Sequence, residues 1–426
     1  MSITLRNVSF AAVVVGAGVW SPRVPADEAG PDFARAMASV AAAPRAAAPR
    51  AAAVARQEPC DGENAKNSHS QISDDDGDRR TTIRWSAGDC QLELRARGRF
   101  VVKGDLSDFE SVARGGWLKL TEERGRSERE LEIRNDDGRM ARTYKVNGAD
   151  HPFDDEARRW LAGVLLELER RTAFAADQRV PRLLASGGPE AVIDEVARLR
   201  GDYAAHVYFS KLFEHVPRLE APLVRRVLTV AGQRISSDYY RTEVLKSVER
   251  RGLPDDASRL AFVTAASTIG SDYYRSEALK LLLDEDDRLT RPVGDALLRA
   301  STGMSSDYYA SETLKRAAMR GLVRADNRDA FFKATREVDS DYYRAEILLS
   351  LLRGDEVDKT LVRDVVAATE GMSSDHYVTE VLLAAAKRYA IEGETRDAYI
   401  KAAKALKSDH YHRQAMSALV KQSMVQ

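Results

Sequence analysis

Ser-Asp-Tyr-Tyr at residues 237–240 decides the fold, because this stretch returns along the rest of the chain at a nearly fixed period. Further copies begin at residues 271, 306, 340, 374 and 408, with His replacing the first Tyr in the last two, so neighbouring copies stand 34 or 35 residues apart. A degenerate copy, Gly-Asp-Tyr, precedes them at 201–203. A period of roughly 20–50 residues is the signature of repeat architectures, whose units bury their apolar faces against one another.

Each period contains the pattern of two helices. At 10, 7 and 3 residues before the repeated Asp, every copy has an apolar residue or alanine, such as Leu228, Ala231 and Ile235, and these spacings share one helix face. Seven residues after the Asp stands Leu, or Met in the last copy, so a second apolar stripe follows. We also expect the second Tyr of each copy to join the core. Each unit is therefore predicted to be a helical hairpin.

The repeated aspartates stand where the second helix of each hairpin begins. Ser-Asp at a helix start satisfies amide N–H groups that lack partners, and the negative charge suits the positive end of the helix dipole. We therefore predict structural helix caps at Asp238, Asp272, Asp307, Asp341, Asp375 and Asp409. The alternative is a functional ladder of acids along one edge of the stack.

The first aromatic of each copy lies off the core stripe and four residues before an acid, so the two side chains share one helix face. Such an aromatic and acidic stripe suits a cationic or Lys/Arg-rich partner. In the alternative interpretation, each Tyr closes the seam between neighbouring hairpins and each Glu bonds locally. The predicted binding stripe consists of Tyr239, Glu243, Tyr273, Glu277, Tyr308, Glu312, Tyr342, Glu346, His376 and Glu380.

Residues 80–150 alternate apolar and polar side chains in short runs such as 91–95 and 130–134, which is typical of half-buried strands. Turn signals between the runs, notably at 135–138 and 147–148, predict hairpins in a small antiparallel β domain. A helix from Asp154 to about Arg171 then opens a stretch of connecting and capping helices.

The predicted fold class is therefore α+β multidomain, with a small antiparallel β domain followed by an α-α superhelical repeat solenoid. The solenoid is called HEAT-like because the tetratricopeptide signature is absent. The predicted divisions are a signal peptide at 1–26, a disordered Ala/Pro/Arg/Asp-rich linker at 27–79, the β domain at 80–150, connecting helices at 151–200 and hairpin repeats at 201–426.

The first twenty-six residues have the three parts of a Sec-type signal peptide: Arg6, an apolar run at 8–20 and a small-residue site at 24–26. They predict a periplasmic or secreted protein, the alternative being an anchor that is retained. No later stretch is apolar enough to cross a bilayer, so we expect at most loose membrane attachment. Cys60 and Cys90 form a possible disulfide in an oxidising compartment.

Composition and motifs argue against several functions. The 65 basic and 66 acidic residues leave a net charge of -1, so no global field favours nucleic acid. The zinc-protease helix, phosphate loop, nucleophile elbow and Cys-x-x-Cys motifs are all missing, so we predict no catalytic residue, metal or cofactor.

The leading hypothesis is a non-catalytic exported scaffold or sensor that holds a protein or peptide on the solenoid. The first alternative is an envelope hydrolase with a site between the β domain and the first hairpins, using His151, Asp154, Asp155 and His206. The second is a purely structural spacer.

The Ser-Asp-Tyr-Tyr repeat, together with the β region and the segment Arg-Leu-Leu-Ala-Ser-Gly-Gly-Pro-Glu-Ala-Val at 182–192, resembles uncharacterised bacterial envelope proteins. Similar regions form C-terminal extensions of membrane zinc metallopeptidases of the β-lactam-sensor antirepressor type. The resemblance covers roughly residues 80–420 and implies a sensory or scaffolding extracytoplasmic module. The chain lacks the multi-pass membrane domain and the His-Glu-x-x-His motif of those enzymes, so the resemblance does not imply peptidase activity.

Overall fold

The computed structural model describes residues 65–75, 78–285, 289–354 and 357–425. Its described residues form two compact units. The first runs to Leu219 and includes Arg234–Ser236, and the second contains Glu220–Gln233 and the chain from Ser237 onward. The predicted signal peptide, the linker up to residue 64 and Cys60 lie outside the described residues, so those predictions stay predictions.

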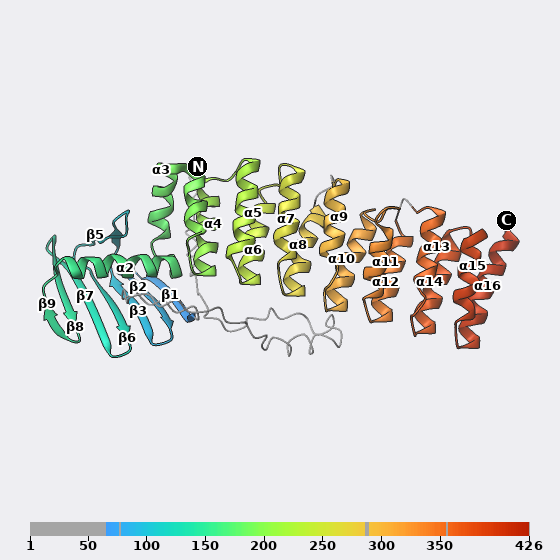
Figure 1. Cartoon of the computed structure of the whole chain (residues 1–426), viewed down its shortest axis with the longest axis horizontal. Helices are drawn as coiled ribbons and strands as arrows, with labels where there is room; N and C mark the ends of the chain where they lie inside the picture. Colours follow the sequence, from blue (N-terminus) through green and yellow to red (C-terminus); the bar gives the residue numbers. More distant parts are fainter. Residues whose placement is uncertain (1–64, 76–77, 286–288, 355–356, 426) are drawn as a thin grey trace, which may run out of the picture. The chain divides into compact units, whose positions relative to one another are not determined.

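A seven-stranded antiparallel sheet dominates the first unit and confirms the predicted β domain (Figure 1). It begins earlier than predicted, because residues 65–75 of the expected linker pair with the next strand along ten register positions. That segment has polar residues without alternation, so its sequence carries no strand signal. In spatial order the strands are β1 (Ala65–Asp75), β2 (Asp78–Ala87), β3 (Cys90–Arg97), β6 (Trp117–Arg124), β7 (Ser127–Asp136), β8 (Arg139–Val146) and β9 (Ala149–His151).

Tight turns set the register at the β8 end of the sheet. Asp137 and Gly138 have φ of 53° and 89°, and Asn147 and Gly148 have φ of 50° and 80°. Two successive positive φ values are what a two-residue hairpin turn requires, and Asn-Gly and Asp-Gly tolerate them at low cost. The turns predicted at 135–138 and 147–148 are thus confirmed.

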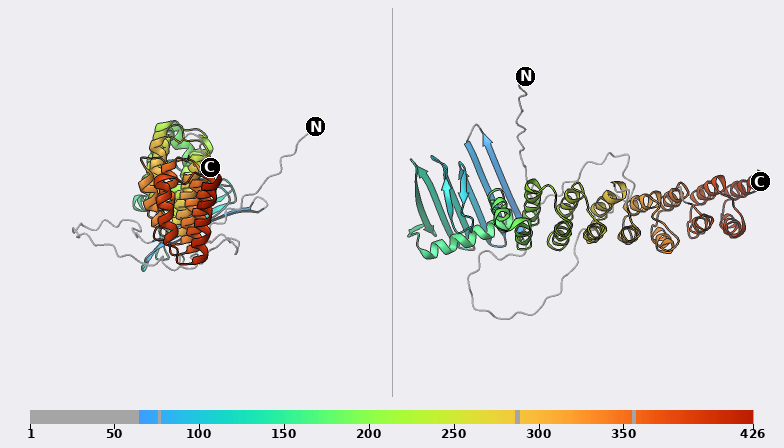
Figure 2. Two further views of the ribbon diagram at one scale, coloured as in Figure 1. Left: turned by 90° about the vertical axis from the view of Figure 1, so that its right-hand side faces the viewer. Right: turned by 90° about the horizontal axis from the view of Figure 1, so that it is seen from above.

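One face of the sheet is buried and the other is open. In β3 the side chains of Cys90, Leu92, Leu94 and Ala96 are buried, and the residues between them point to the opposite face. Helix α2 (Asp155–Thr172) packs on the buried face, as Figure 2 shows.

Helix α2 follows its prediction closely. The Asp154 carboxylate caps it by accepting from the N–H groups of Glu156 and Ala157 at 3.0 and 3.1 Å. The predicted stripe is buried against the sheet, where the Trp160 indole donates to the buried Glu122 carboxylate at 2.7 Å. Burial of that apolar stripe stabilises the joint between helix and sheet. The residues of the stripe are Trp160, Leu161, Val164, Leu165 and Leu168.

A side-chain amide docks a small second sheet, made of β4 (Phe100–Val102) and β5 (Phe109–Val112), onto α3 (Ala176–Val196). Gln178 accepts from the Val102 N–H at 3.0 Å and donates to the Phe100 carbonyl at 3.1 Å, as a neighbouring strand would. Helix α3 is kinked at residues 187–188, where Gly188 has φ of 67°. Helix α4 (Asp202–His215) follows.

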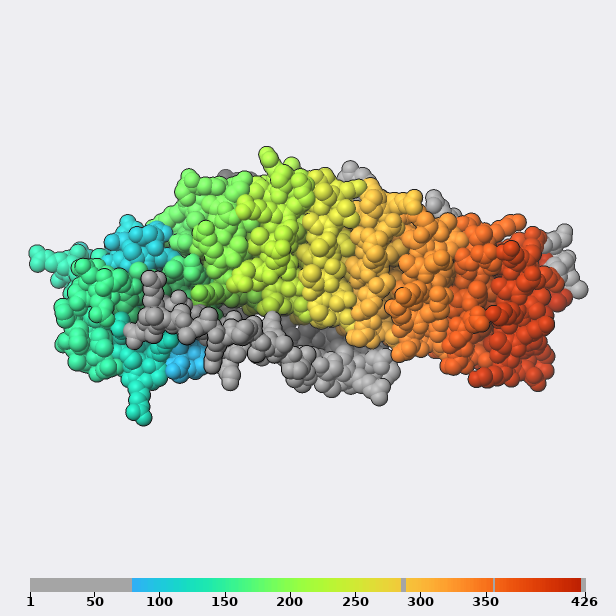
Figure 3. All heavy atoms as spheres, in the orientation of Figure 1, coloured from blue at the N-terminus to red at the C-terminus, as the bar shows by residue number. Residues whose placement is uncertain are grey.

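The second unit is a solenoid of helical hairpins (Figure 1). First helices pack on first helices of the next hairpin, and second helices on second helices, which gives two layers. The space-filling view shows successive hairpins in contact side by side (Figure 3). The described hairpins are α5 (Ala221–Arg234) with α6 (Asp238–Glu249), α7 (Asp256–Ser267) with α8 (Asp272–Glu285), α9 (Arg291–Ala300) with α10 (Asp307–Met319), α11 (Arg328–Arg336) with α12 (Asp341–Leu352), α13 (Lys359–Ala367) with α14 (Asp375–Arg388), and α15 (Gly393–Lys404) with α16 (Asp409–Val425).

Most of the predicted core positions of the hairpins are buried, but Met304, Met372, Ala402, Leu406 and Met416 are only partly buried. Phe262, Phe331 and Tyr399, ten residues before the repeated Asp, have at most 1% of their surface exposed. The leucines seven residues after it, such as Leu245 and Leu348, are equally buried. The second Tyr of each copy is an exception, because it is half-buried at the edge of the stack and not in the core.

Candidate functional site

The second helices of the hairpins begin at the repeated aspartates. Each Asp is the first helical residue, and the N-cap position belongs to the preceding serine at Ser237, Ser306, Ser340 and Ser374. Of these four serines, only Ser237 makes a side-chain cap bond, to the N–H of Tyr240 at 3.5 Å. The carboxylates are therefore available for another role.

That role is to hold the next hairpin. The Asp272 carboxylate accepts from the backbone N–H groups of Ser305 and Ser306 at 2.8 and 2.9 Å and from the Ser305 hydroxyl at 2.7 Å. Asp238 bonds in the same way to residues 270–271, and four more copies make one or more bonds of this kind. A carboxylate that accepts several N–H bonds forms strong, charge-assisted hydrogen bonds. The aspartates with such bonds are Asp202, Asp238, Asp272, Asp307, Asp341 and Asp375.

Arginines add a second link in two of the copies. The Arg241 guanidinium, 7% exposed, donates to the carbonyl and hydroxyl oxygens of Thr268 at 2.7 and 3.1 Å. Thr268 is the C-terminal cap of α7, whose last carbonyls carry the negative end of the helix dipole. Arg344 reaches the Gly371 carbonyl at 3.4 Å in the same manner.

Aromatic rings form a continuous ladder along these helix N-termini. Within a copy, adjacent rings such as Tyr273 and Tyr274 have centroids 4.9 Å apart. Between copies, the first ring packs on the second ring of the next, as Tyr273 does on Tyr309 at 5.6 Å. The edge-to-face geometry is the one that aromatic quadrupoles favour. We call this series the aromatic ladder, and its members are Tyr239, Tyr240, Tyr273, Tyr274, Tyr308, Tyr309, Tyr342, Tyr343, His376, Tyr377, His410 and Tyr411.

The ladder closes the seam between hairpins and still presents ring surface to solvent. Tyr239 and Tyr342 are each 47% exposed, while Tyr273 and Tyr308 are half-buried. Burial, with lesser effects of neighbouring tyrosines, raises the pKa of Tyr309 above its ordinary value, so this phenol stays neutral. The first aromatics can therefore contact a partner without leaving their neighbours.

The predicted stripe carboxylates divide into two groups. Glu243, Glu277 and Glu312 each pair with the lysine three residues later, at 3.2, 2.5 and 2.8 Å. Half-burial alone would raise the pKa of Glu312, but hydrogen bonds from Lys315 and Arg316 outweigh it and hold the pKa below its usual value. In these three copies the acidic charge is already balanced within the helix.

Glu346 and Glu380 form the second group, because leucine stands three residues after each. Glu346 lies 4.0 Å from Lys315 of the preceding copy, and Glu380 lies 3.6 Å from His376. Glu380 is 48% exposed. The lysine partners of the first group are closer, so the negative charge of the stripe is least balanced at its C-terminal end, which we call the acidic end: Tyr342, Glu346, His376 and Glu380.

The first unit holds a buried polar cluster that the sequence analysis missed. Glu169 of α2 is fully buried, accepts from the Tyr208 hydroxyl of α4, and accepts from the Ala175 N–H at 2.7 Å. Arg179 and Glu195 pair nearby at 2.8 Å. Burial raises the pKa of Glu169 to about 7. The sequence signal was a Glu inside an apolar helix stripe, and we interpret the cluster as the joint between three helices.

We next consider the contacts and exposure of the four residues of the alternative hydrolase site. The Asp154 carboxylate is the cap of α2, and Asp155 pairs with Arg158 at 2.9 Å on the surface. His151 is exposed in the short edge strand β9, whereas His206 is half-buried in α4. Asp154 therefore has a structural role, and Asp155 belongs to a surface ion pair.

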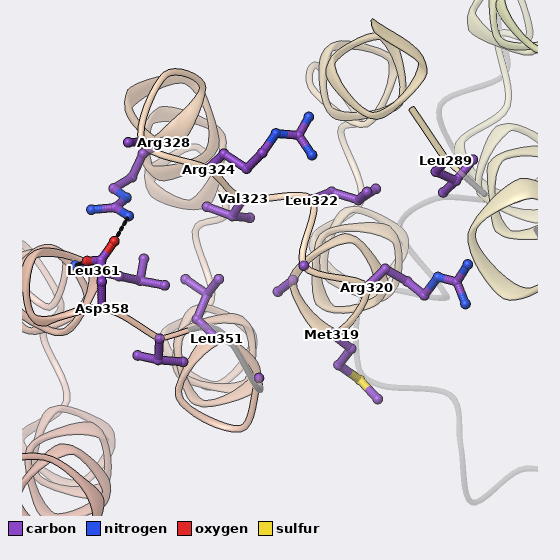
Figure 4. Close-up of a pocket in the computed structure, with 15 residues that line it drawn as sticks. Leu289, Met319, Arg320, Leu322, Val323, Arg324, Arg328, Leu351, Asp358 and Leu361 are labelled. Carbon is purple, nitrogen blue, oxygen red and sulfur yellow. Dashed lines mark hydrogen bonds and ion pairs between the residues drawn. The ribbon is translucent and has the colours of Figure 1, made fainter. Parts of the chain in front are cut away.

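A cavity of about 550 Å³ lies in the second unit between the loop after α10 and the α12–α13 turn (Figure 4). Leu322, Val323 and Leu351 line it, and the dashed line in Figure 4 joins Arg328 to Asp358, 3.0 Å apart. Burial alone would raise the pKa of Asp358, but hydrogen bonds, the largest from Thr360, outweigh it and lower the pKa to about 2. Such a carboxylate is too weak a base for proton transfer near neutral pH.

Other predictions concern metals, membranes and cysteines. No group of three or more His, Cys, Asp or Glu in the described part of the chain could hold a metal ion. None of the helices in that part has the length and hydropathy of a membrane span. Cys90 is buried at the start of β3, and its proposed partner lies outside the described residues.

Comparison with known proteins adds no assignment: no model of a known protein family matches the chain, and no curated protein matches its sequence.

Proposed function

We propose that the chain is a non-catalytic exported scaffold that binds a Lys/Arg-rich protein segment on the acidic end of its aromatic ladder. One observation carries the proposal: Tyr342 has nearly half its surface exposed and shares a helix face with Glu346, and in the described chain neither Glu346 nor Glu380 has a lysine partner closer than 4.0 Å. An exposed aromatic face and carboxylates whose charge is only weakly balanced attract cationic side chains.

The rigidity of the site supports the same proposal. Each aromatic is fixed relative to its neighbours in two ways. The repeated aspartates hydrogen-bond to the loop of the next hairpin, and the rings make edge-to-face contacts. A partner segment therefore meets a preformed surface, which lowers the entropic cost of binding. Export is supported by the N-terminal pattern and by the resemblance to envelope proteins.

The test is the binding of a Lys/Arg-rich peptide to the full chain, with a Glu-rich peptide of equal length as the reference. Glu346→Gln together with Glu380→Gln should weaken binding of the basic peptide at least tenfold. The matched control, Glu243→Gln with Glu277→Gln, changes carboxylates that have close lysine partners, at 3.2 and 2.5 Å, and should alter affinity less than threefold. Equal losses in both pairs, or no preference for the basic peptide, would refute the proposed site.

A further inference from the structure

Neighbouring hairpins place the first rings of the aromatic ladder at a short, regular step. The ring of Tyr377 lies 5.7 Å from that of Tyr342 and 5.0 Å from that of His376. The rings of Tyr342 and His376 are therefore at most about 11 Å apart, which fits the roughly 8–10 Å between the axes of packed helices. The preceding step, from Tyr308 to Tyr342 through Tyr343, has ring distances of 6.0 and 5.0 Å. The ladder thus repeats about every 10 Å along this edge of the solenoid.

At the acidic end, each step presents one exposed ring and one carboxylate. Tyr342 is 47% exposed, and the side chain of His376 is 52% exposed. Each lies one helical turn before a glutamate on the same face, Glu346 or Glu380. Within the described chain, the ion pairs of these carboxylates are the long ones to Lys315, at 4.0 Å, and to His376, at 3.6 Å. A ligand along this edge meets two successive ring-and-carboxylate pairs about 10 Å apart.

A bound polypeptide has to match that step with side chains on one of its faces. A polyproline II helix has three residues per turn and rises about 3.1 Å per residue, so every third side chain returns to the same face after about 9 Å. A β-strand returns to the same face after about 6.6 Å and again after about 13 Å, and neither distance matches a step of about 10 Å. The step therefore favours polyproline II over a strand.

An α-helix matches the distance with side chains seven residues apart, about 10.5 Å along its axis. Helical ligands, however, bind by laying a stripe of apolar anchors into a hydrophobic groove. The acidic end consists of two exposed rings and two carboxylates, which suits an apolar helix face poorly. Proline-rich segments dock on exposed aromatic side chains, and they lose little entropy on binding because their conformation is already formed.

We propose that the partner segment at the acidic end is a polyproline II helix with a basic residue at every third position, as in Arg-Pro-Pro-Arg. This inference rests on the proposed function, because it specifies the conformation and spacing of the same basic partner. One arginine meets the ring of Tyr342 and the carboxylate of Glu346. The next arginine meets His376 and Glu380, and the prolines between them pack beside the rings. Guanidinium groups suit these positions because they stack on aromatic faces and also bind carboxylates.

The experiment measures binding of the full chain to four peptides by calorimetry. The first, the periodic peptide, consists of three Arg-Pro-Pro units, and the second has the same composition with its three arginines adjacent. The third is an alanine-rich helical peptide with three arginines at seven-residue spacing, and the fourth has glutamine in place of each arginine of the periodic peptide. We expect the periodic peptide to bind at least tenfold more tightly than each of the other three.

Two pairs of substitutions locate the site of that preference. Glu346→Gln with Glu380→Gln should reduce the preference for the periodic peptide over the clustered one to less than threefold. Glu243→Gln with Glu277→Gln changes carboxylates with close lysine partners, at 3.2 and 2.5 Å, and should leave the preference unchanged. The melting temperature of each variant is measured as well, because a loss counts only where it stays within a few degrees of the original.

The polyproline II partner is supported if the chain prefers the periodic peptide and that preference depends on Glu346 and Glu380. It is overturned, while the proposed function stands, if all three basic peptides bind alike at the acidic end or if the helical peptide binds most tightly there. Both proposals are overturned if none of the basic peptides binds, if the glutamine peptide binds as tightly as the periodic one, or if both pairs of substitutions have the same effect.

Discussion

At the scale of single residues, the repeated Asp shows how much a motif can and cannot predict. Its position at the start of a helix followed from Ser-Asp and the apolar spacing. The bonds of its carboxylate to the loop of the next hairpin could not be predicted, because the sequence of one copy does not show which residues pack beside it. In hindsight the sequence carries one sign of these bonds, because a serine stands two residues before the Asp in three of the six copies, at Ser236, Ser305 and Ser373. The hydroxyl groups of these serines donate to the Asp carboxylate of the preceding copy.

Replacing Asp272 by Ala removes three hydrogen bonds to a charged acceptor and leaves two backbone N–H groups without their partner. We expect a loss of about 2–3 kcal/mol in the free energy of unfolding of the second unit, measured by urea titration. Asp409→Ala changes the same motif position in the last described copy, which has no following hairpin in the described chain, and should cost less than about 0.5 kcal/mol. Similar losses at both positions would show that the aspartates act mainly within their own helices.

Glu169 gives the first unit a definite pH dependence. Its pKa rises from an ordinary value near 4.5 to about 7 in the folded state, because burial disfavours the charged carboxylate more than the hydrogen bonds from Tyr208 and Ala175 favour it. The folded unit then holds a proton that the unfolded chain releases between these pH values. Stability is therefore fully present below about pH 4.5 and falls by roughly 3 kcal/mol as pH rises to about 7.

The measurement is the melting temperature of the first unit between pH 4.5 and 8 for the original chain and for Glu169→Gln. The amide keeps the neutral state, so the variant should lose most of the decline with pH. Glu128→Gln, an exposed carboxylate, serves as the control and should retain the decline. An unchanged slope in Glu169→Gln would mean that other groups govern the pH dependence.

At the scale of elements, the spacing of apolar residues predicted those helices and strands that bury one face. The hairpin helices, α2 and five strands of the sheet lie where apolar spacing placed them, because each has one buried face. The edge strand β1 was missed because its polar sequence shows no alternation. The small β4–β5 sheet was missed because three- and four-residue strands are too short to show a period.

The docking of β4 on α3 depends on Gln178, whose amide takes the place of a neighbouring strand. Gln178→Ala should lower the stability of the first unit by about 1–2 kcal/mol and accelerate hydrogen exchange at the Val102 amide. Gln91→Ala, on the open face of β3, should alter neither. Unchanged exchange at Val102 in the Gln178 variant would show that the hairpin is held by its apolar contacts alone.

At the scale of the whole molecule, the repeat predicted a solenoid and the β pattern predicted a separate domain. The boundary between the compact units was not predictable, because α4 carries a degenerate copy of the motif and still belongs to the first unit. Function was the least predictable property. The stripe was visible in the sequence, but which of its carboxylates have close cationic partners emerged only from the ion pairs in the structure.

The division into two units predicts separable unfolding. Leu165→Ala removes a fully buried side chain from the first unit, and Phe331→Ala removes one from the second. Each should cost about 2–5 kcal/mol and lower only its own calorimetric transition. If both substitutions shift every transition together, the units unfold as one cooperative body.

The most direct test of the central claim is site-specific photocrosslinking in envelope preparations of the native host, with a photoreactive amino acid in place of Tyr342. Lys404, exposed on α15, is the control position. A scaffold that uses the acidic end should give one discrete adduct at 342, with a Lys/Arg-rich partner peptide at the crosslink. That adduct should be absent at 404 and lost with Glu346→Gln and Glu380→Gln. An adduct that persists in that variant, or the same products at both positions, would contradict the account.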